Sequence, residues 1–110
     1  MEKIIIIYNP IVEIYLNELI DILFLKNYFI LKENATSYVE DLIAFVENNI
    51  HSIQHKNTPQ KITHFGNFYI TYKRTKRTMW YIFFDKKDNR YLIKHITNNH
   101  VENATFLHSL

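Results

Sequence analysis

The sequence predicts a single α+β domain over residues 1–110, with two N-terminal helices packed on a mainly antiparallel sheet. Apolar residues recur at helical spacing in the first half, and they alternate or form continuous runs in the second half. A polar stretch at residues 51–60 separates the two patterns. With 110 residues, 47% of them hydrophobic, the chain can bury one core without disulfide or metal crosslinks. The expected order is strand, helix, helix, strand, strand, strand, with a short C-terminal helix.

The N-terminal segment predicts a strand that leads directly into a helix. Residues 4–7 are consecutive isoleucines, a β-branched run typical of a buried strand. Asn9 and Pro10 predict the helix start, because Asn caps helix N-termini and Pro fits the first helical position. Apolar residues then recur near helical spacing over residues 11–26, which predicts an amphipathic helix. This helix has more apolar residues than one core-facing stripe requires, so the excess is expected to form a partner surface.

A second helix is predicted after a polar break at residues 32–35. Ser37 and Glu40 form a capping box, which predicts that the helix begins at Ser37 and continues to about Ile50. Residues 51–60 are polar and are expected to form a surface connection to the sheet.

The second half predicts a three-stranded antiparallel meander over residues 67–97. Its hairpin turns are expected at residues 74–77 and 85–89, and the aromatic run at residues 79–84 predicts a central strand. Residues 98–110 begin with two asparagines that predict a short helix. With both long helices on one face, the other face of the sheet is expected to stay free for function.

Composition excludes several classes of site and location. The chain has no cysteine, so it has no disulfide, no thiolate zinc site and no cysteine nucleophile, as is usual in a reducing cytoplasm. Charged residues interrupt the apolar stretch at residues 11–31, so we expect no membrane span. The apolar run at residues 4–7 is short and lacks a small-residue cleavage site, so we expect no signal peptide. Its histidines lack regular metal-ligand spacing, and we predict no metal and no cofactor. The protein is expected to be cytoplasmic.

A basic turn is the first candidate for chemistry. Lys73, Arg74, Lys76 and Arg77 place four cations within five residues, where side chains can reach phosphates. The alternative is a solvated turn that is basic for solubility or for protection of a sheet edge.

Histidines near the last strand are the second candidate. His100 is the best general acid or base available, because imidazole exchanges a proton near neutral pH. The alternative is that Asn98, Asn99 and His100 only terminate the strand and cap the C-terminal segment. His95 lies within the strand, shares a face with Tyr91 and Ile93 by alternation, and is expected to be structural. Tyr81 and Tyr91 are candidates for stacking on bases, although most aromatic residues must fill the core.

Three segments resemble the RelE/ParE superfamily of toxins from bacterial type II toxin–antitoxin pairs. They are residues 66–74 (GNFYITYKR), 78–85 (TMWYIFFD) and 91–100 (YLIKHITNNH), which are similar to the family's last three strands. The likeness lies in arrangement more than in an invariant motif. Relatives often have His-Arg or Tyr after the last strand, where this chain has two asparagines and His100.

The resemblance implies a toxin that acts as a metal-independent, ribosome-dependent mRNA endonuclease. It implies phosphate binding by Arg74 and Arg77 and proton transfer by His100. Other residues are expected to contact RNA, namely Lys73, Lys76, Tyr81, Tyr91 and Asn99. The implied partners are an antitoxin, the ribosome and mRNA. Because fold does not fix chemistry, a DNA gyrase poison and an inactive binding module remain the alternatives.

Overall fold

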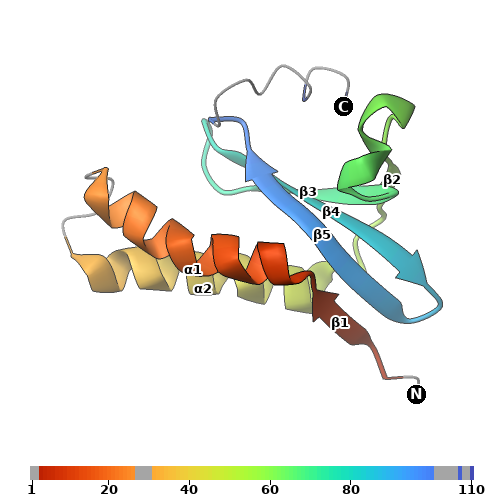
Figure 1. Ribbon diagram of the computed structural model, residues 1–110, viewed down its shortest axis with the longest axis horizontal. Coiled ribbons are helices and arrows are strands. Elements are labelled where there is room, and N and C mark those ends of the chain that lie inside the picture. The colour runs from red at the N-terminus through yellow and green to blue at the C-terminus, as the bar shows by residue number, and fades with distance from the viewer. Residues whose placement is uncertain (1–2, 27–30, 101–106, 108–109) are drawn as a thin grey trace.

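The computed structural model describes residues 3–26, 31–100, 107 and 110. Helices form one layer and a twisted sheet the other (Figure 1). The elements in chain order are β1 (Ile5–Tyr8), α1 (Pro10–Leu25), α2 (Lys32–Asn49), β2 (Lys56–Asn57), the 3₁₀ helix η1 (Gln60–Phe65), β3 (Phe68–Lys73), β4 (Met79–Lys87) and β5 (Arg90–Asn98). The predicted α+β class is therefore confirmed. The C-terminal helix expected over residues 98–110 falls mostly outside the described residues.

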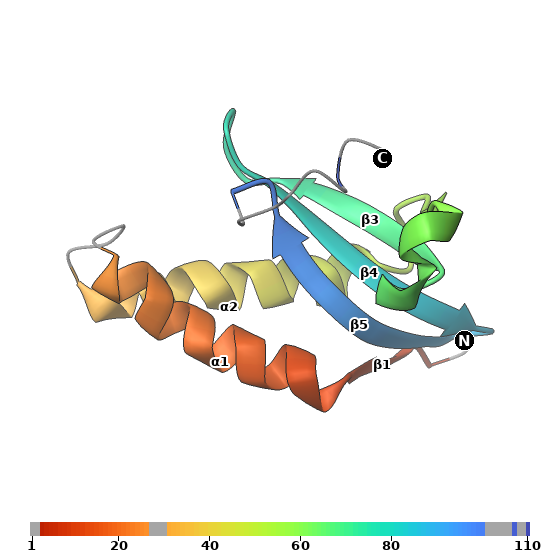
Figure 2. The ribbon, with the colours of Figure 1, turned by 45° about the horizontal axis from the view of Figure 1, so that its top comes forward.

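The sheet has five strands in the order β1-β5-β4-β3-β2. Strand β1 runs parallel to β5, whereas the other neighbouring strands are antiparallel. Helices α1 and α2 lie beneath one face, and the β3–β4 turn lies at the end of the sheet opposite the β4–β5 turn (Figure 2). Among the described residues, no helix is long and apolar enough to cross a membrane.

Helix α1 begins as the sequence predicts. The Asn9 side chain accepts a hydrogen bond from the Ile11 N–H at 3.0 Å, and Pro10 occupies the first turn. Val12, Leu16 and Leu19 recur at helical spacing and are buried against the sheet. The helix ends at Leu25, close to the predicted end.

Helix α2 begins five residues earlier than predicted, at Lys32 instead of Ser37. The polar break expected at residues 32–35 is therefore wrong. Ala35 is fully buried, and Lys32 pairs with Asp21 of α1 at 3.0 Å, so tertiary contacts extend the helix past its local capping signal.

Strand β1 is an edge strand, contrary to the prediction of a buried one. Only β5 pairs with it, and alternate residues face solvent, with Ile7 53% exposed. Ile6 and Tyr8 point to the opposite side and pack against the main core. The run of isoleucines encodes a strand, but strand propensity does not specify how many neighbours that strand acquires.

The β4–β5 hairpin is longer than predicted, and it contains a register shift. The strands continue to Lys87 and from Arg90, so the turn shrinks to Asp88 and Asn89, with Asp88 in the left-handed region at φ 55°. Further along, Phe83 pairs with His95 but Phe84 pairs with Ile93, so β5 has one extra residue between the two pairs.

This bulge places His95 on the opposite sheet face from Tyr91 and Ile93. Tyr91 and Ile93 lie in the main core beneath the helices, whereas the His95 ring contacts Phe65 of η1. The prediction that these three residues share a face is therefore wrong, because one inserted residue reverses the alternation.

The second face of the sheet is covered in part, and the prediction of a free face is wrong there. Ile62 of η1 packs with Tyr69 and Phe83, and Phe65, Tyr81 and Leu110 pack around them, which we call the second core. Phe83 is completely buried. The local sequence of η1 is polar and short, so helical periodicity gave no signal for it.

Candidate functional site

The basic turn and the end of β5, which the sequence suggests as two candidates, lie next to each other in the structure. Thr78 Oγ1 is 2.9 Å from His100 Nε2. The Asn99 side chain bridges the same elements, since its Oδ1 accepts from the Met79 N–H at 3.1 Å and its Nδ2 donates to the Arg77 carbonyl at 2.9 Å. A hydrogen bond from the His100 N–H to Asn98 Oδ1, at 2.7 Å, fixes the backbone here. We call Lys76, Arg77, Thr78, Asn99 and His100 the turn site.

The turn has its own local stabilisation. Thr75 Oγ1 accepts from the backbone N–H groups of Arg77 and Thr78, at 3.2 and 3.1 Å. The Arg74 N–H donates to the Thr78 carbonyl at 2.9 Å and closes the hairpin. Lys73, Lys76 and Arg77 are exposed on this frame. Their charges are therefore displayed at a fixed point of the fold.

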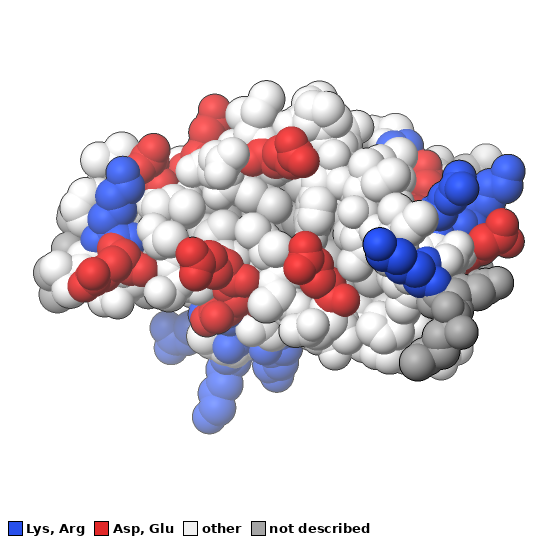
Figure 3. Space-filling view, turned by 90° about the horizontal axis from the view of Figure 1, so that it is seen from below, with Lys and Arg blue, Asp and Glu red and all other residues white. Residues whose placement is uncertain are grey.

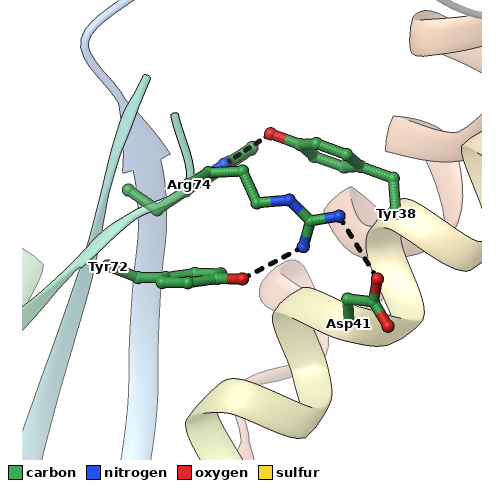
Figure 4. A network of polar contacts seen from close by, with 5 residues as sticks. Tyr38, Asp41, Tyr72 and Arg74 are labelled. Atoms are coloured by element: carbon green, nitrogen blue, oxygen red, sulfur yellow. Dashed lines mark hydrogen bonds and ion pairs between the residues drawn. The ribbon is translucent and has the colours of Figure 1, made fainter. Parts of the chain in front are cut away.

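Arg74 lies in a different environment from its neighbours in the turn (Figure 4). Its guanidinium stacks 4.1 Å from the centre of the Tyr38 ring. Nη1 donates to the Tyr72 hydroxyl at 3.2 Å, and Nη2 pairs with Asp41 Oδ2 at 3.2 Å. Only 18% of its side chain is exposed. The group predicted to hold phosphate is therefore directed at α2.

The partners of Arg74 are themselves anchored. The Tyr38 hydroxyl accepts from Trp80 Nε1 at 2.9 Å, and Trp80 is 1% exposed. Tyr72 stacks on Phe45 of α2 with ring centres 4.1 Å apart. We call Arg74, Tyr38, Asp41 and Tyr72 the Arg74 clamp, since they join α2 to β3. Its position supports a structural role for Arg74 and not the predicted contact with a scissile phosphate.

The two tyrosines predicted to contact RNA have different positions. Tyr91 is 4% exposed, lies in the main core and pairs with Lys86 near the β4–β5 turn, far along the sheet from the turn site. The prediction for Tyr91 is therefore wrong, because its ring faces the helices. Tyr81 is half-buried at the border of the second core, and its strand position pairs with Thr97.

Thr78 is a site residue that the sequence interpretation missed. The observed register explains its position: Trp80 pairs with Asn98, so the antiparallel strands place Thr78 opposite His100, but only because of the inserted residue in β5. The predicted turn ended at residue 77, one residue too early to include it.

His95 lies beside an apolar cavity and not in the turn site. Its ring stacks on Phe65 at 4.3 Å between centres, and burial, with a smaller effect of the nearby His64 charge, lowers the pKa of His95. The cavity of about 390 Å³ lies between α1 and β5, with Ile11, Tyr15 and Thr97 also at its wall. Within the described part of the chain, no cluster of three or more histidines and carboxylates could hold a metal ion.

Charge is segregated between the two halves of the chain. Residues 51–110 contain ten lysines and arginines and three acids, a formal charge of +7 with neutral histidines. Residues 1–50 contain three and eight, a charge of −5, which gives the chain its total of +2. Figure 3 shows acids spread over the helix layer and a group of cations projecting beyond its lower border.

Comparison of the chain with protein-family models, curated proteins and solved structures finds no match. The resemblance to the RelE/ParE superfamily therefore stays a prediction.

Proposed function

We propose that the chain is the toxin of a type II toxin–antitoxin pair and acts as a ribosome-dependent mRNA endonuclease. The observation that supports this proposal best is the 2.9 Å contact between Thr78 Oγ1 and His100 Nε2. It holds a group that can transfer protons at the base of a turn that carries exposed cations. An RNase that uses the 2′-hydroxyl as nucleophile needs this pair of features.

Each turn-site residue has a role in the proposed reaction. Arg77 and Lys76 bind the scissile phosphate and stabilise the additional charge of its transition state. Because Nε2 of His100 contacts Thr78, Nδ1 is the nitrogen that faces the substrate and takes the 2′-hydroxyl proton. The 2′-oxygen forms a bond to phosphorus, the bond to the 5′-oxygen breaks, and that oxygen takes a proton from water. Asn99 holds the turn against β5, and Arg74 holds the end of β3 against α2.

The proposal includes the partners and the location that the reaction requires. The substrate is mRNA on the ribosome, so the protein acts in the cytoplasm. A cognate antitoxin holds it inactive. The proposed contact with RNA also includes Lys73, whose strand partner Met79 follows Thr78, and Tyr81 further along β4.

Primer extension on an mRNA translated in a cell-free system tests the activity. The expected result is new 5′ ends that need both ribosomes and the protein, and their loss in Arg77→Ala and His100→Ala. Lys87→Ala is the matched control, because it removes an exposed cation at the other end of β4 and should cleave like the parent. Intact message with folded protein would contradict the proposal, and cleavage by His100→Ala at the parental rate would contradict the role of His100.

A gyrase poison is the second candidate, and the Arg74 clamp is the observation that favours it. With Arg74 held by α2, one arginine remains in the turn site, fewer than the sequence predicted for a nuclease. A poison acts through protein–protein contact and needs no catalytic group. It would leave message intact and produce cleaved DNA–gyrase complexes, whereas an inactive binding module would produce neither.

A further inference from the structure

Helix α1 has a second apolar stripe that faces solvent. Ile11, Ile14, Ile22 and Leu25 are 73%, 57%, 38% and 74% exposed. With a rotation of about 100° per residue, these positions and Glu18 fall within an arc of about 80° on the helix surface. The buried stripe formed by residues 12, 16 and 19 lies on another side of the helix. Four large aliphatic side chains on one solvent-facing line exceed the scattered exposure usual in a monomer.

The stripe adjoins the apolar cavity at its N-terminal end. Ile11 belongs to both, and the cavity wall continues through Tyr15 to Phe65 and His95. A helix laid along the stripe could therefore insert a large apolar side chain beside β5. Such a pocket supplies an anchor, which is how helix-in-groove interfaces obtain most of their affinity.

Charge restricts what can occupy the stripe. Helix α1 has three acids, Glu13, Glu18 and Asp21, and no lysine or arginine. Asp21 pairs with Lys32, but Glu18 makes no ion pair with any residue that the structure describes. Glu18 lies at the centre of the stripe, with two apolar residues on each side. An occupant must therefore place a compatible group against a central carboxylate.

A second copy of the chain does not meet this condition. The stripe is symmetric about Glu18, so two antiparallel α1 helices would bring Ile11 against Leu25 and Ile14 against Ile22. They would also bring Glu18 against Glu18 of the second copy in a partly desolvated contact. Like charges in such a contact cost several kcal/mol, so the symmetric pair is disfavoured.

We propose that the outward stripe of α1 binds an amphipathic helix of a partner protein, with apolar residues flanking a central lysine or arginine that pairs with Glu18. The apolar residues supply the buried area, and the central cation selects the partner and its register. This surface is distinct from the turn site, so the inference does not depend on the activity proposed there.

Two synthetic helices test the proposal. Both carry leucines at positions complementary to the stripe, and they differ only in a central arginine or a central glutamate. Binding is measured by fluorescence anisotropy of labelled peptide. The full chain is expected to bind the arginine peptide about tenfold more tightly than the glutamate peptide. Glu18→Arg should reverse the preference, which a general loss of folding could not do.

Two further variants locate the binding surface. Ile14→Glu, or Leu25→Glu if the first variant does not fold, should abolish binding. Leu92→Glu is the matched control, because it charges an apolar side chain that is 37% exposed on β5, and it should bind like the parent. The proposal is overturned if neither peptide binds or if both bind equally. It is also overturned if the parent chain dimerises in sedimentation velocity and Ile14→Glu is monomeric, since the occupant is then a second copy.

Discussion

Replacing Arg74 with methionine separates the structural role of this residue from a catalytic one. Methionine keeps an unbranched stem but removes the guanidinium, which stacks on Tyr38 and donates to Tyr72. The stacking contributes about 1 kcal/mol at a partly buried site and the hydrogen bond about 1 kcal/mol. The ion pair adds at most about 0.5 kcal/mol, because Asp41 is 64% exposed. We expect the free energy of unfolding to fall by about 2 kcal/mol and the melting temperature by about 10 °C.

Urea denaturation of Arg74→Met and Arg77→Met provides the comparison. Arg77 lies three residues away with its side chain exposed, so its replacement should change stability by less than about 0.5 kcal/mol. In the cleavage assay the order reverses: folded Arg74→Met should stay active, and Arg77→Met should not. Loss of cleavage in Arg74→Met with parental stability would refute the structural role and return Arg74 to the turn site.

The structure also predicts how three other substitutions change stability. Gly66→Ala should destabilise the fold by at least about 2 kcal/mol in urea, because φ is 148° and a Cβ would lie 2.6 Å from the Phe84 backbone nitrogen. Tyr38→Phe should cost about 1–3 kcal/mol and alter the near-ultraviolet circular dichroism of Trp80, whose buried N–H loses its acceptor; unchanged stability would contradict this. The pKa of His95 is lowered on folding, so its contribution is complete above the ordinary value of 6.5 and is lost as pH falls below that value. His95→Gln should therefore lose less unfolding free energy than the parent between pH 7.5 and 5.5, and equal losses would contradict burial of a neutral ring.

The elements of the fold could be predicted from sequence where the signal was local. Asn9 and Pro10 determine the start of α1 through capping chemistry, and the aromatic run around Trp80 encodes a central strand. Other features depend on contacts between distant residues. The early start of α2 depends on burial of Ala35, and the position of His95 depends on one inserted residue in β5. Alternation predicts faces only as long as the register is unbroken.

The candidate site also depends on contacts between residues that are distant in the sequence. Arg74 and Arg77 are equivalent in sequence, since both are cations of one turn. The fold distinguishes them, because the Arg74 side chain meets Tyr38 and Asp41 of a helix more than thirty residues earlier, whereas the contacts described for Arg77 are those of its backbone. No rule of sequence spacing predicts which residues of α2 contact β3, so the Arg74 clamp could not be predicted from the sequence. The position of Thr78 opposite His100 likewise depends on the fold, because the register that produces it includes the inserted residue in β5.

Charge segregation relates the two proposed surfaces to each other. An RNA backbone attracts the half of the chain that carries +7 and repels the half that carries −5, so a bound chain presents its helix layer away from the phosphates. The stripe around Glu18 would then remain accessible while the turn site is occupied.

A partner helix on α1 alone could not block the turn site by overlap, so an inhibitory partner must extend from α1 to the β3–β4 turn. The acidic layer would direct its basic portion to the helices, and the cations of the turn would favour an acidic portion there. A bipolar partner, basic where it meets α1 and acidic where it meets the turn, is therefore the arrangement that satisfies both surfaces at once.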